Sequence, residues 1–194
     1  MTVLAANSLP DRVADVDALE ELLSRPSQAL IDDLAALKGD IIILGVGGKV
    51  GPCLARMAKR AAPDKRIVGV ARFSDAAVRQ RLEDWGVETI ACDLLHRDGV
   101  NALPKLPNVI YMAGKKFGTS GGEPFTWAMN AHVPALVGEA FAASRIVAFS
   151  TLCVYPFVDV TGPLCGEDVA PVPVGEYANS CVGRERVFQY FSHK

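Results

Sequence analysis

Residues 40–51 constrain the fold of this chain more than any other segment. Four apolar residues, Ile41–Leu44, are followed at once by a stretch in which Gly45, Gly48 and Gly51 recur at every third position. Four apolar residues are too few for a buried helix and are typical of a strand that is covered on both faces. The residues that follow have a helical pattern. The segment therefore predicts a buried strand that turns sharply into a helix.

The same alternation of short apolar runs and helical patterns continues along the chain. Further strands are predicted over Arg66–Ala71, Glu88–Ala91, Asn108–Met112 and Arg145–Ser150. Helices are predicted over 50–62, 75–85, 124–144 and 176–191, and the proline-rich residues 156–175 are predicted to form a loop. This alternation predicts an α/β fold, a Rossmann-like doubly wound parallel sheet with helices on both faces.

Residues 1–38 differ from the rest of the chain because they carry only helical patterns. Two helices are predicted, over 15–24 and 27–37, separated by Arg25 and Pro26. We expect a short helical extension (1–38) that packs on a Rossmann domain (39–194). An arm that docks on a partner is the alternative.

Composition excludes several classes of protein. The chain has 194 residues, of which 50% are hydrophobic and 22% charged, and a net charge of -2. These values exclude a mainly disordered chain and a basic protein that holds nucleic acid. No apolar run approaches the ~20 residues of a membrane span. The five cysteines include no CxxC pair, so the sequence predicts a cytoplasmic protein without a metal site.

The glycine-rich turn also predicts a binding site. A pyrophosphate group can approach a backbone without side chains, and the start of the following helix offers free N–H groups. The spacing fits GxxGxxG better than GxGxxG, because a pattern that begins Gly45-Val46-Gly47 would end on Val50. A tight turn without a ligand is the alternative. The predicted cofactor-binding residues here are Gly45, Gly47, Gly48, Lys49, Val50 and Gly51.

The end of the second strand bears on the choice of cofactor. A protein that prefers NAD usually has an acidic residue there for the ribose hydroxyl, whereas this chain has Arg72. A guanidinium suits a 2′-phosphate, so NADP is favoured over NAD. Asp75 lies nearby, but it is expected to cap the next helix.

Six segments in order resemble one enzyme family. They are GVGGKVG (45–51), CDLL (92–95), NVIYMAG (108–114), WAMNAHVPAL (127–136), FSTLCVYP (149–156) and GEDVAPVPVGEYANSC (166–181). The chain resembles the extended short-chain dehydrogenase/reductases, the NAD-dependent epimerase/dehydratase group, which acts mainly on nucleotide sugars. The resemblance implies an NAD(P)-dependent oxidoreductase or epimerase with a small-molecule substrate.

The resemblance also implies roles for individual residues. Asp93 and Leu94 would border the adenine, and Ala113 and Gly114 would lie under the cofactor's ribose region. Thr151 would hydrogen-bond the reacting sugar oxygen, and Tyr177 would be the general acid or base. The remaining implied roles are cofactor contacts from Ser150 and Tyr177 and a bracing role for Asn130.

The sequence departs from the family pattern at its catalytic helix. The family has YxxxK, and here the lysine is replaced by Cys181. Only about one free tyrosine side chain in a thousand is ionised at pH 7. The family's lysine lowers the pKa of the tyrosine and so raises this fraction. Arg184, Lys115 and Lys116 are candidates for the missing cation. Leu152 and Cys153 also replace the acids of dehydratases, so a standard β-elimination is not expected.

Two function hypotheses remain open at this point. Either the chain belongs to an active oxidoreductase or epimerase, or it is a non-catalytic NAD(P)-binding or redox-sensing protein that has lost the lysine. Family members continue with a C-terminal substrate region that this chain lacks, so we expect a fragment or a unit that borrows its substrate site. The family also implies a homodimer, formed through the helices near 124–144 and 176–191.

Overall fold

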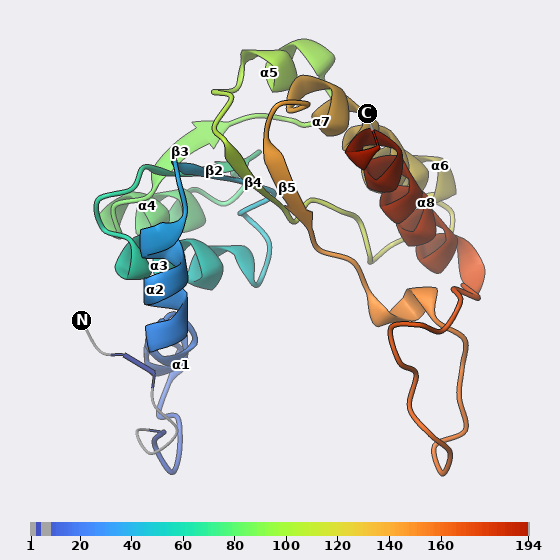
Figure 1. The fold of residues 1–194 in the computed structure, drawn as a ribbon, viewed down its shortest axis with the longest axis horizontal. Coiled ribbons are helices and arrows are strands. Elements are labelled where there is room, and N and C mark those ends of the chain that lie inside the picture. Colours follow the sequence, from blue (N-terminus) through green and yellow to red (C-terminus); the bar gives the residue numbers. More distant parts are fainter. Residues whose placement is uncertain (1–2, 5–8, 194) are drawn as a thin grey trace. The chain divides into compact units, whose positions relative to one another are not determined.

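The computed structural model describes residues 3–4 and 9–193 of the chain. Two compact units are formed, each from several segments (Figure 1). The first contains residues 1–93, 104–112 and 143–147, and the second contains residues 94–103, 113–142 and 148–194.

The first unit contains a five-stranded sheet. Its strands are β1 (Ile41–Leu44), β2 (Ile67–Ala71), β3 (Glu88–Ala91), β4 (Asn108–Tyr111) and β5 (Arg145–Ala148). The order is β3-β2-β1-β4-β5, and β1 pairs in parallel with both β2 and β4. The chain thus builds the sheet outward from β1 in both directions, which is the doubly wound arrangement. The predicted Rossmann-like fold is confirmed.

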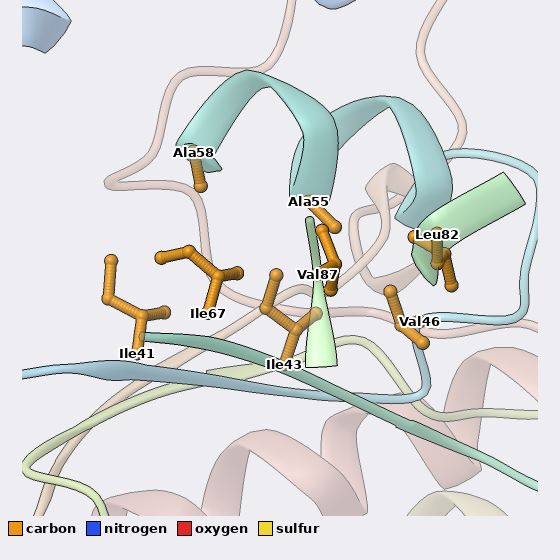
Figure 2. Close-up of a cluster of buried hydrophobic side chains, with 8 residues drawn as sticks. All are labelled: Ile41, Ile43, Val46, Ala55, Ala58, Ile67, Leu82 and Val87. Atoms are coloured by element: carbon orange, nitrogen blue, oxygen red, sulfur yellow. The ribbon is translucent and has the colours of Figure 1, made fainter. Parts of the chain in front are cut away.

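Two helices follow the first two strands and pack close to them. They are α3 (Gly51–Ala61) and α4 (Ala76–Asp84). Figure 2 shows Ala55 and Ala58 of α3 facing Ile41, Ile43 and Ile67. Small side chains on the helix let its backbone approach the strands, and the β-branched isoleucines fill the remaining space. This core fixes the direction in which α3 leaves the turn after β1.

The N-terminal helices α1 (Val16–Leu23) and α2 (Gln28–Ala36) also belong to the first unit. Both contact α3, and the Arg60 guanidinium donates a hydrogen bond of 2.9 Å to Ser24 Oγ. Ser24 is completely buried. Of the predicted extension, residues 1–2 and 5–8 lie outside the described part of the chain.

The second unit is helical. It contains α5 (Arg97–Ala102), α6 (Glu123–Trp127), the π-helical turn η2 (Ala128–His132), α7 (Val133–Ala140), the 3₁₀ turn η3 (Leu152–Val154) and α8 (Gly175–Ser192). α8 contacts α6, η2 and α7. The approach is close at Gly138 of α7, where a Cβ atom would lie 2.3 Å from the Phe191 ring.

The structure differs from the predicted helix over 124–144 in two ways. The helix ends at Ala140, and the η2 turn interrupts it before Pro134. Pro134 has no N–H for the carbonyl of Asn130 four residues earlier, so the regular α-helical bond is lost there. Instead, Val133 N–H bonds to the Ala128 carbonyl, five residues back.

The predicted loop is observed as residues 156–174, which form no helix or strand. Its apolar side chains are exposed, to 88% at Phe157 and 99% at Val160. Among the described residues, no helix combines the length and the apolar character that crossing a membrane requires.

Candidate functional site

The turn after β1 has a backbone conformation that requires glycine at its first position. Gly45 has a φ of 93°, which lies in the left-handed region. Its N–H and that of Val46 both donate to the Val70 carbonyl, at 2.8 and 3.1 Å. The turn is therefore fastened to the end of β2.

Gly51, the first residue of α3, is required for a different reason. A Cβ atom there would lie 2.1 Å from the carbonyl oxygen of Val46. Val46 is itself completely buried and lies against Gly69 of β2, where a Cβ atom would be 3.0 Å from a Val46 methyl group. Close packing of turn, helix and strand thus excludes side chains at both glycines.

The middle of the turn is exposed. Gly47, Gly48, Lys49 and Val50 all face solvent, and a Cβ atom at Gly48 would meet only the Gly45 carbonyl oxygen, at 3.8 Å. Val50 is the N-cap of α3, and its side chain cannot accept a hydrogen bond from the first amides of the helix. Bare backbone and free N–H groups suit an anion such as a pyrophosphate.

Two further predicted residues lie at strand ends in the same unit. Arg72 follows β2 and is exposed, and within residues 9–193 no hydrogen bond or ion pair involves it. Asp75 caps α4 by accepting a hydrogen bond from Ala77 N–H at 2.9 Å, as predicted. Asp93 follows β3, is partly buried and is not without an interaction partner.

The second unit holds the remaining predicted residues around a buried asparagine. Asn130 is fully buried on η2, accepts a hydrogen bond from Lys115 N–H at 2.8 Å and donates one to the Lys115 carbonyl at 2.9 Å. Its amide also donates to Ser180 Oγ on α8, at 2.9 Å. Asn130 therefore joins the segment after β4 to two helices, which fits the bracing role.

In the segment after β4, Ala113 is buried and Gly114 is exposed. A Cβ atom at Gly114 would lie 2.7 Å from an Arg184 nitrogen and 3.1 Å from Asn130 Oδ1. Glycine is thus needed here to make room for a guanidinium. Leu94, in the segment after β3, is buried.

The two predicted catalytic residues lie together in the second unit. Thr151 caps η3 by accepting a hydrogen bond from Cys153 N–H at 3.3 Å. Burial raises the pKa of the Tyr177 phenol above its ordinary value, and the nearby Thr151 side chain opposes that rise. Ser150, one residue earlier, donates a hydrogen bond to Glu185.

Cys181 stands one turn after Tyr177 and is completely buried. Its sulfur lies 3.8 Å from Arg184 Nη2 and 4.0 Å from Asn130 Nδ2. Burial raises the pKa of its thiol, so it is uncharged at neutral pH. Cys181 therefore supplies no positive charge to Tyr177.

Two residues of this cluster were not anticipated from the sequence. Ser180 is fully buried and donates to the Tyr177 carbonyl at 2.7 Å, and Glu185 accepts from Ser150. Ser180 has no motif of its own, and the only signal for it is its position between Tyr177 and Arg184 on one helix. Within the described ranges, no group of three or more histidines, cysteines or acidic residues is arranged to hold a metal ion.

Comparison with known proteins gives similarity to solved structures only. No known family model matches the sequence, and no curated protein is similar to it. The structure of MoeE5 in complex with UDP-glucose and NAD is 21% identical, with a TM-score of 0.66 over 80% of this chain and 50% of that chain. UDP-glucuronic acid 4-epimerase from Bacillus cereus, in complex with UDP-glucuronic acid and NAD, is 20% identical, with a TM-score of 0.66 over 80% and 52%.

A third similar structure is the UDP-Glc/GlcNAc 4-epimerase of Campylobacter jejuni. It is 18% identical and has a TM-score of 0.68 over 80% of this chain and 50% of that chain. The chain thus spans about half the length of these proteins. At these identities the likeness concerns the fold, and this chain has the fold of one half of each of them.

Proposed function

We propose that the chain is the NAD(P)-binding part of an extended short-chain dehydrogenase/reductase of the epimerase/dehydratase group. The observation that carries the proposal is the turn over residues 45–51. It leaves the backbone of Gly47 and Gly48 bare at the start of a helix, and packing forces glycine at Gly45 and Gly51. The shared fold with proteins whose structures contain NAD supports the same proposal.

The proposed domain spans residues 39–194, with residues 1–38 as an extension. In the first unit the proposed cofactor-binding residues are Gly45, Gly47, Gly48, Lys49, Val50, Gly51, Arg72 and Asp93. In the second unit they are Leu94, Ala113, Gly114, Ser150 and Tyr177.

For the choice between the two dinucleotides, the exposed Arg72 favours NADP, because a guanidinium can bind a 2′-phosphate through paired hydrogen bonds. Two of the similar structures named above, MoeE5 and the Bacillus cereus epimerase, contain NAD. Calorimetric titration with each dinucleotide decides between them. Arg72→Ala is expected to lower NADP affinity at least tenfold, about 1.4 kcal/mol, and to leave NAD affinity unchanged. Equal losses for both would remove Arg72 from the proposal.

The proposed chemistry acts on a hydroxyl or keto group of a nucleotide sugar or similar substrate. When it is bound, the nicotinamide supplies or accepts the hydride. Tyr177 gives a proton to the reacting oxygen or takes one from it, and Thr151 holds that oxygen by a hydrogen bond. Because burial keeps the Tyr177 phenol protonated at neutral pH, it begins as the acid. Its action as a base needs a nearby positive charge.

A second function is supported by one observation. Cys181 stands where the resemblance places the family's lysine, and its buried, neutral thiol favours a non-catalytic NAD(P)-binding or redox-sensing protein. Both functions require dinucleotide binding, but only the first requires turnover.

The experiment uses the whole chain in two steps. NADPH fluorescence and calorimetry first measure binding, and no affinity for either dinucleotide at millimolar concentration would refute the proposal. Oxidation of NADPH, or epimerisation, is then followed with a panel of nucleotide sugars that includes UDP-glucose and UDP-glucuronic acid. Turnover that Tyr177→Phe abolishes supports the enzyme. Binding without turnover supports the second function.

The assembly and the compartment are also part of the proposal. The family resemblance supports a cytoplasmic homodimer, formed through the helices within residues 124–144 and 176–191. Light scattering at several concentrations tests the dimer, and a constant monomer mass would refute it.

A further inference from the structure

Arg184 is a buried cation without an acidic partner. Only 7% of its surface is exposed. Nη1 donates to the Phe149 carbonyl at 2.9 Å and Nη2 to Asn130 Oδ1 at 3.1 Å, whereas the buried Nε has no hydrogen-bond partner. No carboxylate pairs with this guanidinium in the part of the chain that the structure describes. Burying an unpaired charge is costly, so a function is the expected reason for its retention.

The residues near the guanidinium form one row on α8. Tyr177, Cys181 and Arg184 stand at positions i, i+4 and i+7, which share a helix face. The Cys181 sulfur is 3.8 Å from Arg184 Nη2, and Cys181 stands one helical turn after Tyr177. Along this helix face, Cys181 therefore lies between Tyr177 and Arg184. The charge of Arg184 lowers the pKa of both groups, against the effect of burial.

The other two cations near this segment have different surroundings. Lys115 Nζ lies over the Phe125 ring, 5.4 Å from its centre, and Lys116 Nζ lies over the exposed Phe117 ring, at 5.7 Å. Neither lysine lies on α8, whereas Arg184 shares a face of that helix with Tyr177. Besides burial, the pKa of Tyr177 responds to Thr151, Cys181 and Arg184. Of the three candidates for the missing cation, the geometry selects Arg184.

We propose that Arg184 supplies the positive charge that stabilises the Tyr177 phenolate, acting partly through the sulfur of Cys181. A guanidinium does not lose its proton in proteins, so Arg184 stays cationic while Tyr177 exchanges a proton with the reacting oxygen. Arg184 is thus a positioning residue that acts through charge. The inference rests on the proposed function, because it assigns the acid or base of that site.

The first test measures the ionisation of Tyr177 without any dinucleotide. Tyrosinate absorbance is followed against pH in the wild-type protein, and the curve of Tyr177→Phe is subtracted to isolate this residue. Arg184→Gln is expected to raise the midpoint by about one pH unit, because an opposite charge at short range shifts a pKa by roughly 1–3 units. Arg186→Gln is the matched control, since Arg186 is exposed on the same helix and bonds Gln189. A folded Arg184→Gln protein with an unchanged midpoint overturns the inference.

A second measurement, made on the wild-type protein, covers the case in which Arg184→Gln does not fold. The ¹³Cζ resonance of Arg184, assigned by its absence in Arg184→Lys, is followed through the ionisation of Tyr177. It is expected to shift at the Tyr177 midpoint and to lose this shift in Tyr177→Phe. A resonance that does not respond refutes the coupling.

The two proposals fail in different ways. Calorimetry with NAD and NADP tests the dinucleotide site alone, whereas the two titrations test Arg184 alone. If turnover is found, Arg184→Gln is expected to move the limb of the kcat–pH profile that Tyr177 controls toward higher pH, and Arg186→Gln to leave it in place. A profile that stays in place in a folded Arg184→Gln protein removes Arg184 from the mechanism.

Discussion

The turn after β1 provides a pair of glycine substitutions that separates packing from binding. In Gly51→Ala, the new Cβ atom would lie 2.1 Å from the Val46 carbonyl oxygen. Since unstrained contacts are about 3.5 Å or longer, the turn or the helix must move by about 1 Å. Such overpacking destabilises the folded state by roughly 1–3 kcal/mol, whereas the higher helix propensity of alanine stabilises it by up to about 1 kcal/mol.

We therefore expect Gly51→Ala to lower the free energy of unfolding by up to about 2 kcal/mol. This corresponds to a fall in Tm of roughly 4–8 °C for a chain of this size. Gly48→Ala is the matched control. Its Cβ atom would meet only the Gly45 carbonyl oxygen, at 3.8 Å, so stability should stay equal or rise by about 0.5 kcal/mol. Its methyl group would still cover the bare backbone of the turn and is expected to weaken dinucleotide binding at least tenfold, about 1.4 kcal/mol.

Urea denaturation followed by circular dichroism measures the first effect, and calorimetric titration with NAD or NADP measures the second. Equal stability of Gly51→Ala and the wild-type protein would contradict the close contact with Val46. Unchanged dinucleotide affinity in Gly48→Ala would mean that the pyrophosphate does not lie on this turn.

Three further predictions concern the packing described above. Because burial raises the pKa of Cys181, the folded state holds that proton more tightly, so this contribution to stability is complete below about pH 9 and is lost as the pH rises. Cys181→Ala should therefore reduce the fall in unfolding free energy between about pH 8 and pH 10.5, measured in urea. An equally steep fall would argue against this. Asn130→Ala leaves the backbone of Lys115 without its partners and should cost about 2–4 kcal/mol by thermal unfolding, whereas a loss below about 1 kcal/mol would contradict its bracing role. Arg60→Met removes the hydrogen bond to Ser24 and should speed amide hydrogen exchange in α1 while leaving exchange in α8 unchanged. Equal protection of α1 in Arg60→Met and in the wild-type protein would refute this.

The sheet was predictable because its strands leave a clear pattern. Short apolar runs such as Ile41–Leu44 indicated all five strands and their succession, and the glycine spacing indicated where the first strand turns into a helix. The helix α5 was missed because its six residues, Arg97–Ala102, include Asp98 and Gly99 and have no apolar period. Short polar helices depend on tertiary contacts, which a single sequence does not display.

The site was predictable only in part. The spacing identified Gly45 and Gly51, but the physical demand at Gly51 is a contact with a backbone oxygen, which no residue pattern encodes. The interval of seven residues identified Arg184 as one candidate among three, and its burial beside Cys181 separates it from the two lysines. The cofactor contacts, the catalytic roles and the boundary at residue 38 stay predictions.

The π-helical turn η2 has a consequence for the helices on either side of it. A turn closed by a bond five residues back contains one residue more than an α-helical turn, so it changes the angular phase between α6 and α7 by about 100°. Deleting a single residue from Ala128–His132 would restore a straight helix but rotate one flank away from its present neighbours. Either Asn130 would leave Ser180, or Gly138 would leave Phe191, so a regular helix is incompatible with keeping both contacts.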